Sequence, residues 1–179
     1  LYGGDFADFL AAFEPAASLP YLSDVARLEW AVNCALHAPD AEPLDANRLA
    51  AVDPELHECI RFVVEPSVSV LRTEYPADAI WRAVLAHDDA SLAAVNLADG
   101  PVQLIVQRLA TGVEVVRIDA SALRVTIALI QGQTLGDALV VADASAAAAV
   151  LADHLAAGRF VWFEIIQESA AVPSTETIA

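Results

Sequence analysis

Two short segments bring together side chains that can bind a metal. Cys34 and His37 are three residues apart, which places both on one face of a helix, and His57, Glu58 and Cys59 follow about twenty residues later. Structural zinc sites repeat such pairs in patterns such as Cys-x-x-Cys, and neither segment does so. A buried cysteine usually acts as a small apolar residue. We therefore expect no metal and no cofactor.

Motifs for catalysis are missing from the sequence. His87 and His154 are isolated, and there is no G-x-S-x-G, P-loop or glycine-rich dinucleotide fingerprint. Carboxylate pairs are frequent only because the chain contains 25 acidic residues. The sequence predicts a protein that is not an enzyme by itself.

The charge is strongly negative. Nine arginines and no lysine stand against 25 acidic residues, which gives a net charge of -16. A protein that binds DNA must neutralise phosphates, and neither half of the chain is basic. The favoured interpretation of the acidic surface is solubility, and the alternative is a basic partner.

The sequence also suggests where the protein works. No apolar run approaches the roughly 18 residues of a membrane-spanning helix, and no segment is organised like a signal peptide. The two cysteines are too few for a disulfide scaffold. We expect a cytoplasmic protein without a membrane partner.

Residues 1–86 predict a helical domain. Aromatic residues at helical spacing indicate a helix over 5–13, and a second helix follows Pro20, with Ser23 as its N-cap. The core stripe of the second helix is expected at Val25, Leu28, Val32 and Leu36. A short helix near 46–52, an extended segment within 61–75 and a helix over 78–85 complete this domain.

Residues 92–168 predict a second domain, after a boundary within 86–100. Strands over 102–109 and 113–118 are joined by three residues that end in Gly112, and a third strand is expected near 95–97. Helices over 121–130, 134–141 and 145–157 and a last strand over 159–167 follow. The predicted class is α+β, with a winged-helix-like second domain and a mobile tail over 169–179.

Two stretches carry a resemblance to a known family. They are YGGDFADFLAAFEPAASLPYLSDVARLEWAVNCALHAPDAEPLD, from residue 2 to 45, and EPSVSVLRTEYPADAIW, from residue 65 to 81. They contain the elements Y-G-x-x-F-x-x-F-L, L-P-Y-L-x-D-V-A-R-L-E-W and P-S-x-x-x-L-x-x-x-Y-P. The chain thereby resembles the HvfC/BufC family, long labelled a DNA-binding domain.

The resemblance implies a partner protein. Members are similar to the partners of multinuclear non-haem iron-dependent oxidative enzymes, which modify cysteines in ribosomally made peptides. It implies that the helical half docks on the enzyme, that the second half captures the leader of the precursor peptide, and that further helices precede residue 1. One departure is Glu65, where the family often has His.

These implications give two sets of candidate residues. We expect the peptide to add as a strand along 113–118 and to pack on the helix over 145–157, through Val113, Val115, Arg117, Val150 and His154. The alternative is that the alanines of this helix only allow close packing. Enzyme docking is assigned to Arg27, Glu29 and Trp30. The alternative there is structural, with Arg27 in intramolecular ion pairs and Trp30 between helices.

DNA binding is the competing function. A winged helix suits the major groove, but the candidate recognition helix over 145–157 contains neither Arg nor Lys. It has almost nothing with which to hold a phosphate or read a base edge. The sequence therefore favours peptide binding.

Overall fold

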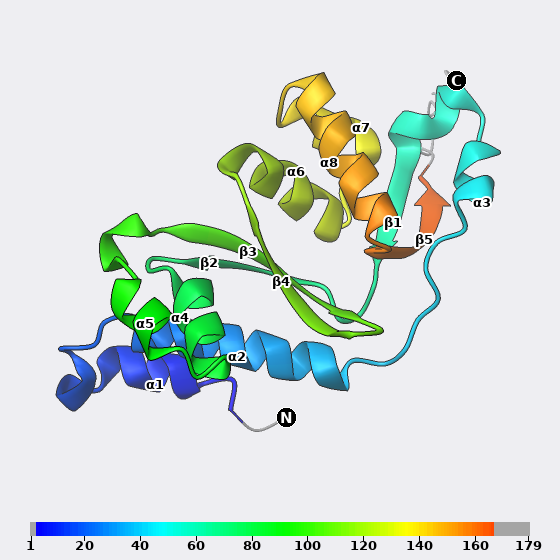
Figure 1. The fold of residues 1–179 in the computed structure, drawn as a ribbon. Helices are drawn as coiled ribbons and strands as arrows, with labels where there is room; N and C mark the ends of the chain where they lie inside the picture. Colours follow the sequence, from blue (N-terminus) through cyan, green and yellow to red (C-terminus); the bar gives the residue numbers. More distant parts are fainter. Residues whose placement is uncertain (1–2, 167–179) are drawn as a thin grey trace, which may run out of the picture.

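The computed structural model describes residues 3–166 and shows an α+β protein with two small antiparallel sheets, each with its own hydrophobic core (Figure 1). The predicted α+β class is confirmed. Residues 167–179, which include the predicted tail over 169–179, lie outside the described part of the chain. None of the helices in the described part is long and apolar enough to cross a membrane.

The first core lies between a three-stranded sheet and two helices. The strands β2 (Ser69–Thr73), β3 (Val102–Leu109) and β4 (Gly112–Ile118) pair in the order β2-β3-β4. Side chains alternate between the two faces of a sheet, so Leu104, Val106 and Val115 share one face. That face packs on α2 (Leu22–His37) and α4 (Ala77–Leu85).

Shorter elements extend this half of the molecule. Helix α1 (Phe6–Ala12) packs on α2 and is followed by η1 (Glu14–Ala16), and α5 (Asp89–Ala94) and η3 (Leu97–Asp99) follow α4. Gly100 then passes so close to the turn between β2 and α4 that a Cβ would overlap the carbonyl oxygen of Glu74 and lie 2.9 Å from the Cα of Tyr75. Glycine is therefore required there for steric reasons.

The second core lies under a two-stranded sheet. Strand β1 (Ile60–Val64) pairs with β5 (Phe160–Ile165) and packs against α6 (Ala120–Ile130), α7 (Leu135–Val140) and α8 (Ala144–Ala156). The rings of Phe62 and Phe160 stack with centroids 4.5 Å apart. Two short helices, α3 (Ala46–Ala50) and η2 (Pro54–Cys59), precede β1 in the chain. Each core therefore contains elements from both sides of the predicted boundary within 86–100.

Most predicted elements are present, and three details are corrected. The strand expected near 95–97 is wrong, because the Asn96 side chain caps the short helix η3 and the third strand of the sheet is β2. The N-cap expected at Ser23 is wrong, because α2 begins at Leu22 after Tyr21. Leu36 is 52% exposed and does not belong to the core.

Candidate peptide-binding groove

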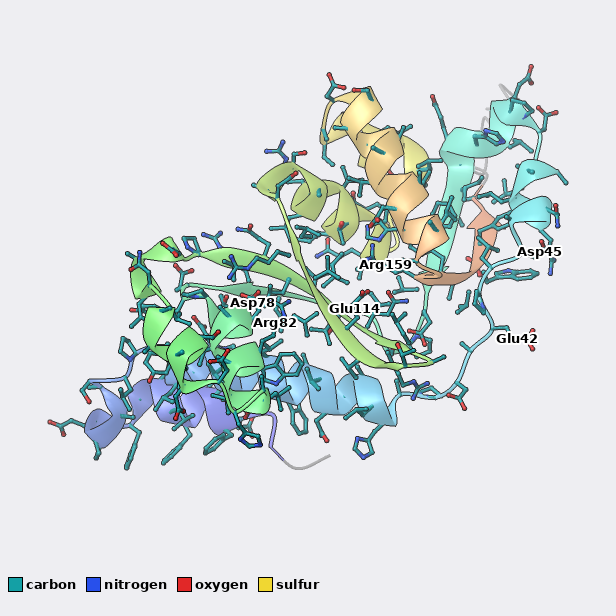
Figure 2. The ribbon with its side chains drawn as sticks, in the orientation of Figure 1. Glu42, Asp45, Asp78, Arg82, Glu114 and Arg159 are labelled. Carbon is teal, nitrogen blue, oxygen red and sulfur yellow. The ribbon has the colours of Figure 1, made fainter. Side chains whose placement is uncertain are left out.

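Strand β4 forms one edge of the three-stranded sheet, and the Asp78 and Arg82 side chains of α4, labelled in Figure 2, bond to it. In the described part of the chain, β3 is the only strand paired with β4. The Arg82 side chain of α4 donates from Nη2 to the carbonyl oxygen of Val115 at 2.6 Å. The middle of β4 therefore already has a side-chain partner, and its two ends are left for other contacts.

A buried carboxylate holds α4 to β4. Both oxygens of Asp78 accept from Arg117, at 2.8 Å from Nε and from Nη2, and Arg82 Nη1 donates to Oδ2 at 2.6 Å. Burial alone raises the pKa of the Asp78 carboxyl, but the hydrogen bonds and charges of Arg117 and Arg82 outweigh it. The pKa of Asp78 therefore lies below its usual range, and the group stays ionised at neutral pH.

A cavity of about 310 Å³ opens beyond this ion pair, where β4 leads into α6. Alanine side chains from α6 and α8, Ala122 and Ala149, leave room in its wall, as the alanine-rich sequence of α8 suggested. The lining residues are Ile105, Arg117, Ile118, Asp119, Ala122, Thr126, Ala149, Val150, Asp153 and His154.

The structure brings together three of the five predicted peptide-binding residues. Arg117, Val150 and His154 all line the cavity. Val113 and Val115 do not, because they pack in the first core. Arg117 shares their face of β4 but lies at the end of the strand, where the cavity opens. The alternative interpretation of the alanines applies to Ala147, which is buried in the second core.

His154 anchors a buried hydrogen-bond network under the cavity. Arg159 Nη1 lies 3.1 Å from His154 Nδ1, and Thr126 Oγ1 lies 2.9 Å from His154 Nε2. Because a guanidinium can only donate, Nδ1 accepts, and Nε2 carries the proton and donates to Thr126. Arg159 also donates to Asp153 at 2.6 Å and to Gln107 at 3.2 Å. Figure 2 shows Arg159 near the C-terminal end of α8.

This network keeps the imidazole uncharged. Burial, and then the positive charge of Arg159, lower the pKa of His154 from 6.5 to about 4, while Asp153 acts in the opposite direction. Protonating Nδ1 would also direct a new N–H at the guanidinium. At neutral pH His154 is therefore an uncharged, hydrogen-bonded part of the wall, and it has no dissociable imidazolium proton to give to a ligand.

The rim of the cavity is polar and partly acidic. Backbone hydrogen bonds from Ala122 and Ser121 at the start of α6 hold the pKa of Asp119 below its usual range. The carboxylate of Asp153, on α8, also lines the cavity and is bound to Arg159. An apolar wall with a few polar groups at its rim is the usual composition of a binding pocket.

The two stretches that carry the family resemblance contact each other. Asp24 Oδ2 accepts from the backbone N–H groups of Glu74 and Tyr75 at 2.8 and 3.1 Å, and Asp24 Oδ1 accepts from Arg27 at 3.1 Å. Asp24 is buried. This carboxylate therefore fixes α2 to the turn that begins α4.

Glu65, where the family often has His, also has intramolecular partners. Its carboxylate accepts from the backbone N–H of Ser67, at 2.9 Å, and from the Ser67 hydroxyl. The Ser67 oxygen in turn accepts from the backbone N–H of Arg108 at 2.9 Å. Glu65 therefore stabilises the link between β1 and β2.

The predicted docking residues lie on α2. Arg27 forms ion pairs with Asp8 of α1 and with Asp24, both at 3.1 Å, and the Trp30 ring lies against Gly3. These contacts are those of the structural alternative. Glu29 is exposed. A docking role for Arg27, Glu29 and Trp30 stays a prediction.

The candidate metal ligands have separate surroundings. His37 Nδ1 lies 2.8 Å from the carbonyl oxygen of Asn33, and His57 Nε2 lies 3.1 Å from that of Val52. Cys34 and Cys59 are free thiols, both half-buried. Within residues 3–166, no three side chains of His, Cys, Asp or Glu are close enough together to hold a metal.

Several residues that shape the groove could not be recognised from the sequence. Asp78 was predicted only as the first residue of the helix over 78–85. Its partner Arg117 is 39 residues away, and Gln107 and Arg159 are 52 residues apart. No local sequence pattern predicts hydrogen bonds between residues that are so far apart in the chain.

Comparison with known proteins adds no family to this description. Neither the protein-family models nor the curated proteins that were searched contain a match to the chain. The function proposed below depends on the geometry of the groove and on the sequence resemblance described above.

Proposed function

We propose that this protein is a non-catalytic partner protein that binds a ribosomally made precursor peptide and presents it to an iron-dependent peptide-modifying enzyme in the cytoplasm. The observation that supports it is the cavity lined by Arg117, Val150 and His154, next to the edge of β4. In this proposal the β3–β4 hairpin, helices α6 to α8 and β5 act together as a winged-helix-like peptide-recognition unit.

The proposed peptide lies along the C-terminal end of β4. Arg82 occupies the carbonyl oxygen of Val115, so pairing along the whole of 113–118 would have to displace it. Pairing that begins near Arg117 leaves this contact intact and places the peptide beside the cavity. Backbone pairing gives affinity that tolerates different sequences, and a pocket selects one side chain.

The cavity suits an apolar side chain. Its volume of about 310 Å³ is at the lower end of the range of about 300–1,000 Å³ for ligand pockets. His154 is neutral at neutral pH, and the Asp153 and Arg159 charges compensate each other. Apart from the Asp119 carboxylate at the rim, the wall therefore carries no uncompensated charge, and selection inside the cavity depends on the shape of the side chain.

The test is a substitution on α8 whose larger side chain reduces the volume of the cavity. We compare Ala149→Leu, which places a larger side chain in the wall, with Ala148→Leu, which changes the neighbouring exposed alanine outside the lining. Binding is measured by fluorescence anisotropy with the labelled precursor peptide of the same gene cluster. We expect Ala149→Leu to weaken binding by at least about tenfold, or about 1.4 kcal/mol, and Ala148→Leu to bind like the wild type.

Two outcomes contradict the proposal. The first is equal peptide affinity of the wild type and Ala149→Leu. The second is retention on duplex DNA with the salt dependence of several phosphate contacts, which would restore the DNA-binding function. The high net negative charge predicts no such retention at physiological salt.

A further inference from the structure

Helix α1 presents its aromatic side chains to solvent. Phe6 and Phe9 of the helix are both 54% exposed, and Phe13, the C-cap residue that follows it, is 42% exposed. Their spacing of three and four residues places the three rings along one side. Neighbouring rings stack on each other, with centroids 6.2 and 5.1 Å apart. The side that contacts α2 carries the small Ala7, which is buried. The more apolar side of α1 thus faces away from the core, opposite to the usual arrangement.

A hollow lies beside the C-terminal end of α1, and none of the three phenylalanines is part of its lining. It has a volume of about 300 Å³ and lies where α1 turns through η1 into α2. Leu10 of α1 is part of its lining, and Leu19, which is 43% exposed, is another part. A row of exposed, stacked aromatic rings at helical spacing can pack against the apolar face of an amphipathic helix. Exposed apolar patches of this kind commonly mark interaction sites.

The charges around the aromatic face are negative. Residues 1–37 contain five carboxylates and one arginine. That arginine, Arg27, is already paired with Asp8 and Asp24. Asp5 and Glu14, at the two ends of the aromatic face, are both exposed. A second copy of this chain would bring the same carboxylates against each other, and its net charge of -16 adds to the repulsion.

We propose that the aromatic face of α1 (Phe6, Phe9 and Phe13) binds a basic amphipathic helix of a partner protein. Apolar side chains of that helix pack on the three rings, and its Lys or Arg residues lie near Asp5 and Glu14. This surface is separate from the groove: α1 lies on the α2 side of the three-stranded sheet, while α6 and α8 lie on the other side (Figure 1).

The probe is a labelled helical peptide of about 14 residues made of Leu and Lys, with Leu at positions i, i+3, i+4 and i+7. Its anisotropy is measured against the full chain at an ionic strength of about 0.15 M. The comparison peptides have Glu in place of Lys, or the same Leu and Lys residues in scrambled order. We expect the Leu-Lys helix to bind and both comparison peptides to bind at least about tenfold more weakly.

The variants locate the site. Phe9→Ser removes the central ring, and Val140→Ser is the matched control, because Val140 is an 85% exposed apolar residue on α7. We expect Phe9→Ser to raise the dissociation constant by about tenfold or more and Val140→Ser to leave it unchanged. Phe9 is largely solvated, so its replacement preserves the fold, which far-UV circular dichroism verifies.

Three results would overturn this inference. They are equal affinity of Phe9→Ser and the wild type, equal affinity for the Glu peptide, and a homodimer in sedimentation that Phe9→Ser dissociates. The last result would assign the face to a second copy of the chain. Each outcome is independent of Ala149→Leu, so this surface and the proposed peptide groove fail or stand separately.

Discussion

Replacing His154 by Gln should remove a specific part of the pH dependence of folding stability. His154 is 2% exposed and bonded to Arg159 and Thr126. In the unfolded chain an imidazole takes up a proton near pH 6.5. In the folded protein the pKa of His154 is about 4. Between these two values the unfolded state binds more protons, so acid favours unfolding.

The size of the effect follows from the two pKa values. The contribution of His154 to stability is complete above about pH 6.5 and is lost progressively as the pH falls toward the folded pKa of about 4. The difference of 6.5 to about 4 corresponds to about 3 kcal/mol over the whole interval. In the middle of the interval the slope for one proton is about 1.4 kcal/mol per pH unit.

The assay is urea unfolding followed by far-UV circular dichroism, at about pH 7, 6 and 5. The wild type and His154→Gln carry the same carboxylates, so the difference between their two curves isolates the imidazole. We expect the wild type to be the more stable at pH 7 and its advantage to shrink as the pH falls. The control variant His37→Gln shows what loss of an exposed histidine does to the same curve.

The reasoning would be refuted by parallel curves. If wild type and His154→Gln lost stability equally between about pH 6.5 and 4, the imidazole would titrate alike in the folded and unfolded states. The burial and the Arg159 contact would then have no effect on its protonation. The size of the difference at any single pH does not test the reasoning, because it also includes lost packing; only the change of that difference with pH does.

Three further predictions concern the packing of the two cores. Asp78→Asn should lower the free energy of unfolding by about 2–4 kcal/mol at pH 7, and Asp89→Asn, at an exposed carboxylate, should leave it unchanged. Because the pKa of Asp78 is lowered, the difference between Asp78→Asn and the wild type should persist below about pH 4 and vanish as the pH falls through the lowered value. Gly100→Ala should cost about 1–3 kcal/mol in thermal unfolding, because its Cβ meets backbone atoms; an unchanged midpoint would contradict this. Leu104→Ala and Leu129→Ala, one in each core, should each cost about 2–5 kcal/mol in a single transition; two separate transitions would show that the cores unfold independently.

The elements could be predicted because their signals are local. Pro54 and Gly158 mark the ends of elements, and the β-branched run in β3 has the composition of a strand. The sheet pairings could not be predicted in this way. Apolar residues near Val95 look as suitable for the third strand as those of β2, and only long-range register distinguishes them.

The groove could be predicted in part for a similar reason. The sequence of β4 has apolar residues on both faces, Val113 and Val115 on one and Val116 and Ile118 on the other. Alternation shows which residues share a face but not which face meets α2. The prediction chose one face for the peptide. The structure packs Val113 and Val115 of that face in the first core, and of its predicted residues only Arg117 lines the cavity. His154 and Val150 both line the cavity, because helical periodicity shows which residues of α8 share a face, and only one face of that helix is available to the groove.

The pairing of β1 with β5 has a consequence for the synthesis of the protein. Ile60 pairs with Ile165, so β1 leaves the ribosome about a hundred residues before its partner exists. At roughly 5–20 residues per second, this strand waits unpaired for about 5–20 seconds. During that time Ile60 and Phe62, both buried in the finished protein, are exposed on an open strand edge that can pair with other chains. Charged residues lie before, within and after this strand: Glu58, Arg61 and Glu65. Their charges oppose pairing with other chains until the ribosome has synthesised Phe160–Ile165.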